Sequence, residues 1–277
     1  MVHPRKVLDI IELVFYVPAL VISILVSVRH GFGRQLGWIF LFLLAVIRVI
    51  GAITGIASFH NPSLGLLEAS VITNSIGLSP LLQAMLGMLK RVHDGMSSGK
   101  GFAPRLFKFI HTPIVVALVL AIIGGTKSFD NNIDSQNLGR TLTKVAVLLF
   151  LFGLIALATV AFVTLFKIGH VVHGERKLVS AAVTSIPFLF VRMVYSIVVA
   201  FSSPDSKVFS LVSDTKAAVI VQAFMAVAEE FAVVTIYLLA GLFTPVIPRS
   251  QVRQNSKGYQ QPSNQDQVYT MQGRATR

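Results

Sequence analysis

The sequence contains no cysteine and has few charged residues. Without cysteine, the chain cannot form disulfides, thiolate metal sites, iron–sulfur clusters or a cysteine nucleophile. Charged residues make up 13% of the 277 residues and apolar residues 54%, whereas soluble domains carry about 25% charged residues. The mean hydropathy is +0.73. This composition excludes a single soluble domain and predicts a multi-pass membrane protein.

Seven apolar stretches are long enough to cross a bilayer, which requires about 20 residues per helix. They lie at 8–29, 36–58, 63–89, 106–125, 144–167, 179–201 and 217–243. The sequence therefore predicts an all-α fold, a polytopic bundle of seven transmembrane helices, within a membrane domain at 1–248. The polar composition of 249–277 predicts a disordered cytosolic tail. An integral membrane location follows, and the sequence does not distinguish the plasma membrane from an endomembrane.

The lysines and arginines outside the spans predict the orientation of the chain. The connections 29–35, 90–105 and 167–178, together with the tail, carry 14 Lys and Arg residues, against 7 on the other side. Because these residues concentrate on the cytoplasmic side, the N-terminus is predicted outside and the C-terminus in the cytosol. Membrane topology thus accounts for the net charge of +12, and no nucleic-acid partner is expected. The longer outer connections, 126–143 and 202–216, are polar and are predicted to be loops.

Four ionisable residues lie near the middle of predicted spans: Arg48, Arg192, Glu229 and Glu230. An ionised side chain in hydrocarbon is costly and marks either a pathway or a paired charge. Two arginines balance two glutamates, so pairing across helices is the cheapest arrangement. The adjacent glutamates point about 100° apart, so one is predicted to pair with Arg192 and the other to reach Arg48 or a cavity. The set is either a structural group of ion pairs or a polar cavity that binds a head group, an ion or a proton.

The third predicted span is the most polar of the seven. Glu68, Asn74 and Ser75 lie within it, on the outer side of the four mid-membrane charges. Pro80 lacks the amide hydrogen that a continuous helix needs, so a kink with a freed backbone carbonyl is predicted here. Asp9 and Glu12 in the first span lie at a similar outer depth to Glu68, and either an acidic outer mouth or water-facing helix ends explain them.

The chain lacks the signatures of several cofactors and enzymes. A transmembrane di-haem site needs histidine pairs on facing helices, and His111 is the only histidine inside a predicted span. The last span has no lysine for a retinal Schiff base, and no P-loop, GxSxG, HExxH or dinucleotide motif occurs. We therefore predict no cofactor, no metal and no catalytic residue. An intramembrane enzyme that uses Glu68 with Glu229 or Glu230 as general acids is the least favoured alternative.

Two stretches of the sequence resemble a known family. They are Arg48-Val-Ile-Gly51 in the second span and Asn74-Ser-Ile-Gly-Leu-Ser-Pro-Leu-Leu82 in the third, which Gly87 and Arg91 follow. Over residues 1–245 the chain resembles a family of fungal seven-helix integral membrane proteins of unknown function (domain of unknown function 7702). The resemblance implies a seven-helix fold with a polar C-terminal tail and implies no established activity. More distantly, the chain is similar in topology to the RTA-like lipid-translocating exporters.

The mid-membrane charges lead to one functional hypothesis and two alternatives. We expect a non-enzymatic protein that binds or translocates a lipid-like or amphipathic small molecule at a polar intramembrane site. Its predicted partners are membrane lipids and this ligand, and the sequence leaves the oligomeric state open. The first alternative is a seven-helix sensor that signals through the basic connections 90–105 and 167–178. The second is the intramembrane enzyme.

Overall fold

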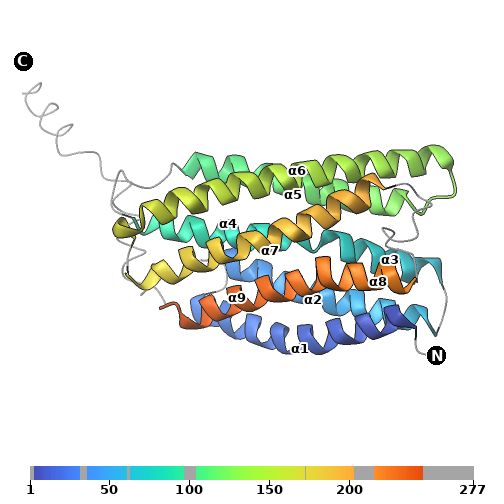
Figure 1. The fold of residues 1–277 in the computed structure, drawn as a ribbon, viewed down its shortest axis with the longest axis horizontal. Helices are drawn as coiled ribbons and strands as arrows, with labels where there is room; N and C mark the ends of the chain where they lie inside the picture. Colours follow the sequence, from blue (N-terminus) through green and yellow to red (C-terminus); the bar gives the residue numbers. More distant parts are fainter. Residues whose placement is uncertain are drawn as a thin grey trace, which may run out of the picture. The chain divides into compact units, whose positions relative to one another are not determined.

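The computed structural model describes residues 3–31, 36–60, 63–96, 104–171, 173–202 and 215–245, and they are almost entirely helical (Figure 1). The helices are α1 (Pro4–His30), α2 (Leu36–Ser58), α3 (Leu64–Ile76), α4 (Leu78–Asp94), α5 (Pro104–Lys127), α6 (Ile133–Phe166), α7 (Arg176–Phe201), α8 (Lys216–Gln222) and α9 (Glu229–Phe243). A π-helical segment, Ala223–Ala228, joins α8 to α9. These described ranges contain no β-strand. The predicted tail and most of the connection at 202–216 lie outside the described residues.

Seven helical segments are long and apolar enough to cross a membrane. One of them combines α3 and α4, and another combines α8, the π-helical segment and α9. The protein is therefore an all-helical, integral multi-pass membrane protein. This confirms the fold class and the membrane location that its composition predicts. The outside position of the N-terminus stays a prediction.

The span that contains α4 is the most deeply buried of the seven. In its most apolar stretch 71% is buried, against 28–44% in the other six spans. α4 packs against α2, α5, α6 and α7, and side chains such as Leu82 and Met85 are fully enclosed. Large apolar side chains such as Val14, Phe109 and Phe224 are instead exposed on the outside of the helices. Such an outer surface suits contact with lipid chains rather than with water.

The third span is interrupted at Gly77, close to the predicted position. α3 ends at Ile76 and α4 begins at Leu78, two residues before Pro80. Proline at this point cannot donate a hydrogen bond to the carbonyl of Ile76, four residues earlier, which loosens the helix there. Gly77 also lets side chains approach its backbone closely, because a Cβ atom on it would lie 2.6 Å from Nη2 of Arg48. The interruption therefore lies directly against a mid-membrane charge.

The start of α6 differs from the prediction. The sequence predicts a loop at 126–143 before a span at 144–167, whereas α6 already begins at Ile133. The side chain of Asn132 accepts a hydrogen bond from the backbone N–H of Asp134 at 3.0 Å and so caps the helix. Asp134 lies in the first turn, where the helix dipole favours an acidic residue. The predicted loop is wrong over 133–143, because hydropathy marks apolar stretches and misses a polar first part of a helix.

Candidate intramembrane polar site

Arg48 of α2 and Glu230 of α9 form a buried ion pair with two hydrogen bonds. Nε of Arg48 donates to Oε1 of Glu230 at 2.5 Å, and Nη2 donates to Oε2. Arg48 is 3% exposed and Glu230 is 1% exposed. Both residues lie near the midpoint of their spans. The forked geometry aligns two charge-assisted hydrogen bonds, so each charge receives its counter-ion where water cannot solvate it.

Tyr16 and Asn74 complete the hydrogen bonding of this ion pair. The hydroxyl of Tyr16 donates to Oε1 of Glu230 at 2.5 Å, and Oδ1 of Asn74 accepts from Nη1 of Arg48 at 2.6 Å. Glu12, one turn before Tyr16 on α1, has its Oε2 3.8 Å from the same Nη1. We call Arg48, Glu230, Tyr16 and Asn74 the clasp. The clasp joins α1, α2, α3 and α9 in the interior of the bundle.

Arg192 of α7 lies beside the clasp and is bound differently from Arg48. Its Nη2 donates to the backbone carbonyl of Asn74 and its Nη1 to Oγ of Ser196, both at 3.2 Å. Its Nε forms an ion pair with Oε2 of Glu230 at 3.7 Å and makes no hydrogen bond within the described residues. The guanidinium carbon lies 5.8 Å from the ring centroid of Tyr195. Arg192 is 5% exposed, so a buried cation here has no carboxylate hydrogen-bonded to it.

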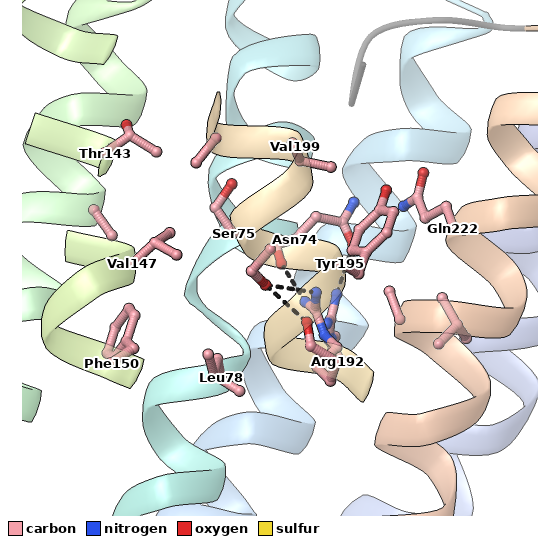
Figure 2. A pocket seen from close by; sticks show the side chains of 16 residues that line it. Asn74, Ser75, Leu78, Thr143, Val147, Phe150, Arg192, Tyr195, Val199 and Gln222 are labelled. Atoms are coloured by element: carbon pink, nitrogen blue, oxygen red, sulfur yellow. Dashed lines mark hydrogen bonds between the residues drawn. The ribbon is translucent and has the colours of Figure 1, made fainter. Parts of the chain in front are cut away.

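A pocket lies next to Arg192 and the clasp (Figure 2). The space in it that the centres of water-sized molecules can occupy is about 60 Å³, and part of the pocket is open to its surroundings. Polar side chains in its wall are those of Arg48, Asn74, Ser75, Thr143, Arg192, Tyr195, Ser196 and Gln222. The apolar part of the wall is formed by Leu78, Ala121, Val147, Phe150, Val199, Ala200, Ala226 and Val227. Figure 2 shows Val147 and Phe150 of α6 across the pocket from Tyr195 of α7.

The π-helical segment determines which of the two adjacent glutamates enters the clasp. In an uninterrupted α-helix, Glu229 would share a side with Gln222, seven residues earlier, and Glu230 would point about 80° away. The wider turns of a π-helix accommodate roughly one extra residue. This shift brings Glu230 to the side of Gln222, and both side chains are buried. Glu229 is partly exposed, so the local helix geometry selects Glu230.

One family model matches the chain across almost all of its helical part. The match, Domain of unknown function (DUF7702), covers residues 2–246. The chain belongs to this family. No curated protein and no solved structure matches it. The match confirms the DUF7702 family predicted from two stretches of sequence, and the residues that begin those stretches, Arg48 and Asn74, are both members of the clasp.

This DUF7702 protein brings most of the predicted site residues together. Those that meet at the clasp or line the pocket are Arg48, Asn74, Ser75, Arg192 and Glu230. Glu229 and Glu68 are both partly exposed. Within the described residues, no hydrogen bond or ion pair joins either of them to the clasp. The two arginines therefore meet Glu230 and Glu12 instead of the predicted pair of adjacent glutamates.

The sequence prediction missed two residues of α1, Tyr16 and Glu12. Glu12 lies near the end of the first span, where a water-facing position explains a carboxylate equally well, yet it is 3% exposed. Tyr16 follows it by four residues and thus shares its side of the helix. A polar side chain in mid-span on the same face as an acidic residue is a signal that could have pointed to both. Their partners are on α2 and α9, so the pairing itself depends on the fold.

A second buried ion pair lies where α4 ends and α7 begins. Arg91 of α4 donates from Nε to Oε1 of Glu175 at 3.1 Å, and its Nη1 lies 3.4 Å from Nδ1 of His30. Glu175 directly precedes α7 and is 6% exposed. Its Oε2 has no hydrogen-bond partner in the part of the chain that the structure describes. Burial raises the pKa of the Glu175 carboxyl, although Arg91 acts in the opposite direction.

Arg91→Gln should destabilise the protein less at about pH 5 than at about pH 7.5. Without Arg91, an ionised Glu175 is buried with no cation beside it. Since the pKa of folded Glu175 lies above its ordinary 4.5, stability is lost as the pH rises above that value and regained as it falls. Thermal unfolding at both pH values should show that the unfolding free energy lost through Arg91→Gln is smaller at the lower pH by on the order of 1 kcal/mol. The double variant Arg91→Gln/Glu175→Gln should lose this dependence, and an equal loss for Arg91→Gln at both pH values would contradict the prediction.

Proposed function

We propose that this DUF7702 protein binds or translocates a lipid-like or amphipathic small molecule in the pocket beside Arg192. The observation that carries the proposal is the composition of the pocket wall. A buried arginine and several hydrogen-bonding side chains lie on one part of it, and aliphatic and aromatic side chains on another. Ligand pockets combine such an apolar wall with a few polar groups that orient the ligand.

The helices that form the pocket suit a ligand taken from the bilayer. The apolar wall includes Val147 and Phe150 of α6 and Val199 of α7. These side chains offer a hydrocarbon chain the same surroundings as the lipid that it leaves. The polar wall includes Asn74, Ser196 and the cation of Arg192, which can bind a head group that bilayer hydrocarbon cannot solvate. An amphipathic molecule therefore matches both parts of the wall.

The clasp accounts for the mid-membrane charges only in part. Arg48 and Glu230 satisfy one another through two hydrogen bonds, which suits a structural ion pair that holds α2 to α9. Among the described contacts, Arg192 donates no hydrogen bond to that pair, and it borders the pocket. A buried arginine is costly to keep in a membrane. Its position at a pocket therefore favours a role in binding over a purely structural one.

Filling the pocket should abolish labelling by an amphipathic photoprobe. We would reconstitute the full chain in phosphatidylcholine nanodiscs and add a long-chain fatty acid, fatty alcohol or fatty amine, each with a diazirine in its chain. Mass spectrometry should find at least one probe on Val147, Phe150 or Val199. Ala200→Trp places a large side chain in the pocket wall and should lower this labelling by about tenfold or more.

The matched control is Thr184→Trp, which adds the same indole to an exposed position of the same helix, α7. It should leave labelling of the three pocket residues unchanged. Labelling that is equal in the wild type and in Ala200→Trp, or labelling confined to the exposed outer side chains, would refute the proposed function.

A further inference from the structure

We infer that the head group bound in this pocket is an anion, a carboxylate or a phosphate ester on a hydrocarbon chain, and that Arg192 binds it. The inference rests on the proposed function and narrows its ligand class. It assigns different roles to the two mid-membrane arginines. Arg48 holds the helices together, and Arg192 recognises the ligand.

Each nitrogen of the Arg48 guanidinium already donates a hydrogen bond within the protein. Its Nε and Nη2 are bound to both carboxylate oxygens of Glu230, and its Nη1 is bound to Asn74. Glu12 adds a second carboxylate 3.8 Å from Nη1. A ligand anion that bound Arg48 would have to separate a forked ion pair, and that would leave Glu230 as a buried charge without a partner.

Within the described residues, Arg192 has no hydrogen-bonded counter-ion, because its ion pair with Glu230, at 3.7 Å, is longer than a hydrogen bond. Both of its hydrogen bonds go to neutral oxygens, the carbonyl of Asn74 and the hydroxyl of Ser196. The nearest carboxylate atom, Oε2 of Glu230, is 3.7 Å from its Nε and already accepts a hydrogen bond from Arg48. Nε itself has no hydrogen-bond partner although it is fully buried. A carboxylate or phosphate in the pocket would supply the charged acceptor that this guanidinium lacks.

The charge of the pocket wall also favours an anion. Among the described residues that line the pocket there are two arginines and no aspartate or glutamate. The Tyr195 ring beside the guanidinium of Arg192 holds it through a cation–π contact. Gln222, in the same wall, provides a further hydrogen-bond donor. An amine head group would find two cations and no carboxylate in this wall, so the pocket should reject it.

The test compares the three photoprobes, which have equal chains and differ in the charge of their head groups. In nanodiscs of zwitterionic phosphatidylcholine, the fatty acid should label the pocket about tenfold more than the alcohol or the amine. A long-chain alkyl phosphate should compete with the fatty acid. Acetate and inorganic phosphate should not compete at equal concentration, because they cannot occupy the apolar wall. Competition by these two small anions would overturn the assignment of an amphipathic ligand.

Variants of Arg192 distinguish recognition from folding. Arg192→Gln should remove the preference for the fatty acid while the melting temperature stays close to that of the wild type, because the clasp is retained. Arg192→Lys keeps the positive charge and should restore most of the preference, which a merely structural role would not predict. The control Arg140→Gln removes one positive charge from an exposed position at the start of α6 and should leave the preference unchanged.

The outcomes separate the inference from the function on which it rests. Pocket labelling that is equal for the three head groups, or a fatty-acid preference that persists in Arg192→Gln, would overturn the inference and leave the proposed function standing. If Arg192→Gln does not fold, loss of the preference in Arg192→Lys would overturn it as well. Absence of pocket labelling by all three probes would refute the proposed function itself.

Discussion

Glu230→Gln should lower the free energy of unfolding by about 3–5 kcal/mol. The substitution preserves the shape of the side chain but removes the charge that Arg48 binds through Nε and Nη2. Arg48 is 3% exposed and cannot lose its proton, so it would remain in the membrane interior with Glu12, 3.8 Å away, in place of its hydrogen-bonded counter-ion. Tyr16 would also lose a charged hydrogen-bond acceptor. Denaturant titration in detergent micelles, with helical content as the signal, measures the change.

The neighbouring residue provides a matched control. Glu229→Gln makes the same chemical change one position earlier, where the side chain is partly exposed and makes no hydrogen bond or ion pair with the described residues. It should change the unfolding free energy by no more than about 0.5 kcal/mol. The double variant Arg48→Gln/Glu230→Gln should recover a large part of the loss of the single variant. Equal losses of unfolding free energy in Glu229→Gln and Glu230→Gln would show that the ion pair between Arg48 and Glu230 does not stabilise the fold.

Gly77→Ala should lower the unfolding free energy by about 2–3 kcal/mol, although alanine is the better helix former. The added Cβ would lie 2.6 Å from Nη2 of Arg48 and 3.1 Å from Oε2 of Glu230. Neither side chain can move away without lengthening the hydrogen bonds between them. The cost therefore includes both the steric overlap and the weakened ion pair, and it can be measured by the same denaturant titration.

Gly65→Ala is the control for this substitution. Gly65 lies in the same helix, α3, and nothing is within 4 Å of the position that its Cβ would take. Here the higher helix propensity of alanine should dominate, with a gain of up to about 1 kcal/mol. In a Glu230→Gln background, Gly77→Ala should cost less than in the wild type, because less of an ion pair remains to be disturbed. Equal costs in both backgrounds would mean that the clasp is not what limits space at Gly77.

Together, these substitutions separate two uses of charge in one membrane interior. The clasp is a satisfied ion pair whose loss should appear as instability. Arg192 is a buried cation at a pocket, and its loss should appear as a change in ligand preference. The four mid-membrane charges of the sequence therefore do not act as one site, because their side chains have different neighbours.

Several features followed from the sequence without any knowledge of the fold. Apolar stretches of about 20 residues predict membrane spans because the cost of exposing polar backbone to lipid depends mainly on length and composition. Arg48, Arg192 and Glu230 could be singled out because a charge within such a stretch is costly wherever its neighbours lie. Pro80 predicted a kink in the third span because its missing N–H is a property of the residue itself.

The tertiary structure decided which of these charges meet. A π-helical segment turns Glu230 rather than Glu229 toward Arg48, and the difference depends on a rotation of about 100° that hydropathy does not record. Glu12 and Tyr16 enter the site because α1 packs beside α2 and α9. The contrast between a satisfied Arg48 and an Arg192 beside an open pocket arises from the spacing of helices that are distant in sequence. Composition determines that a charge must find a partner, whereas packing alone determines whether that partner is a side chain of the protein or a ligand.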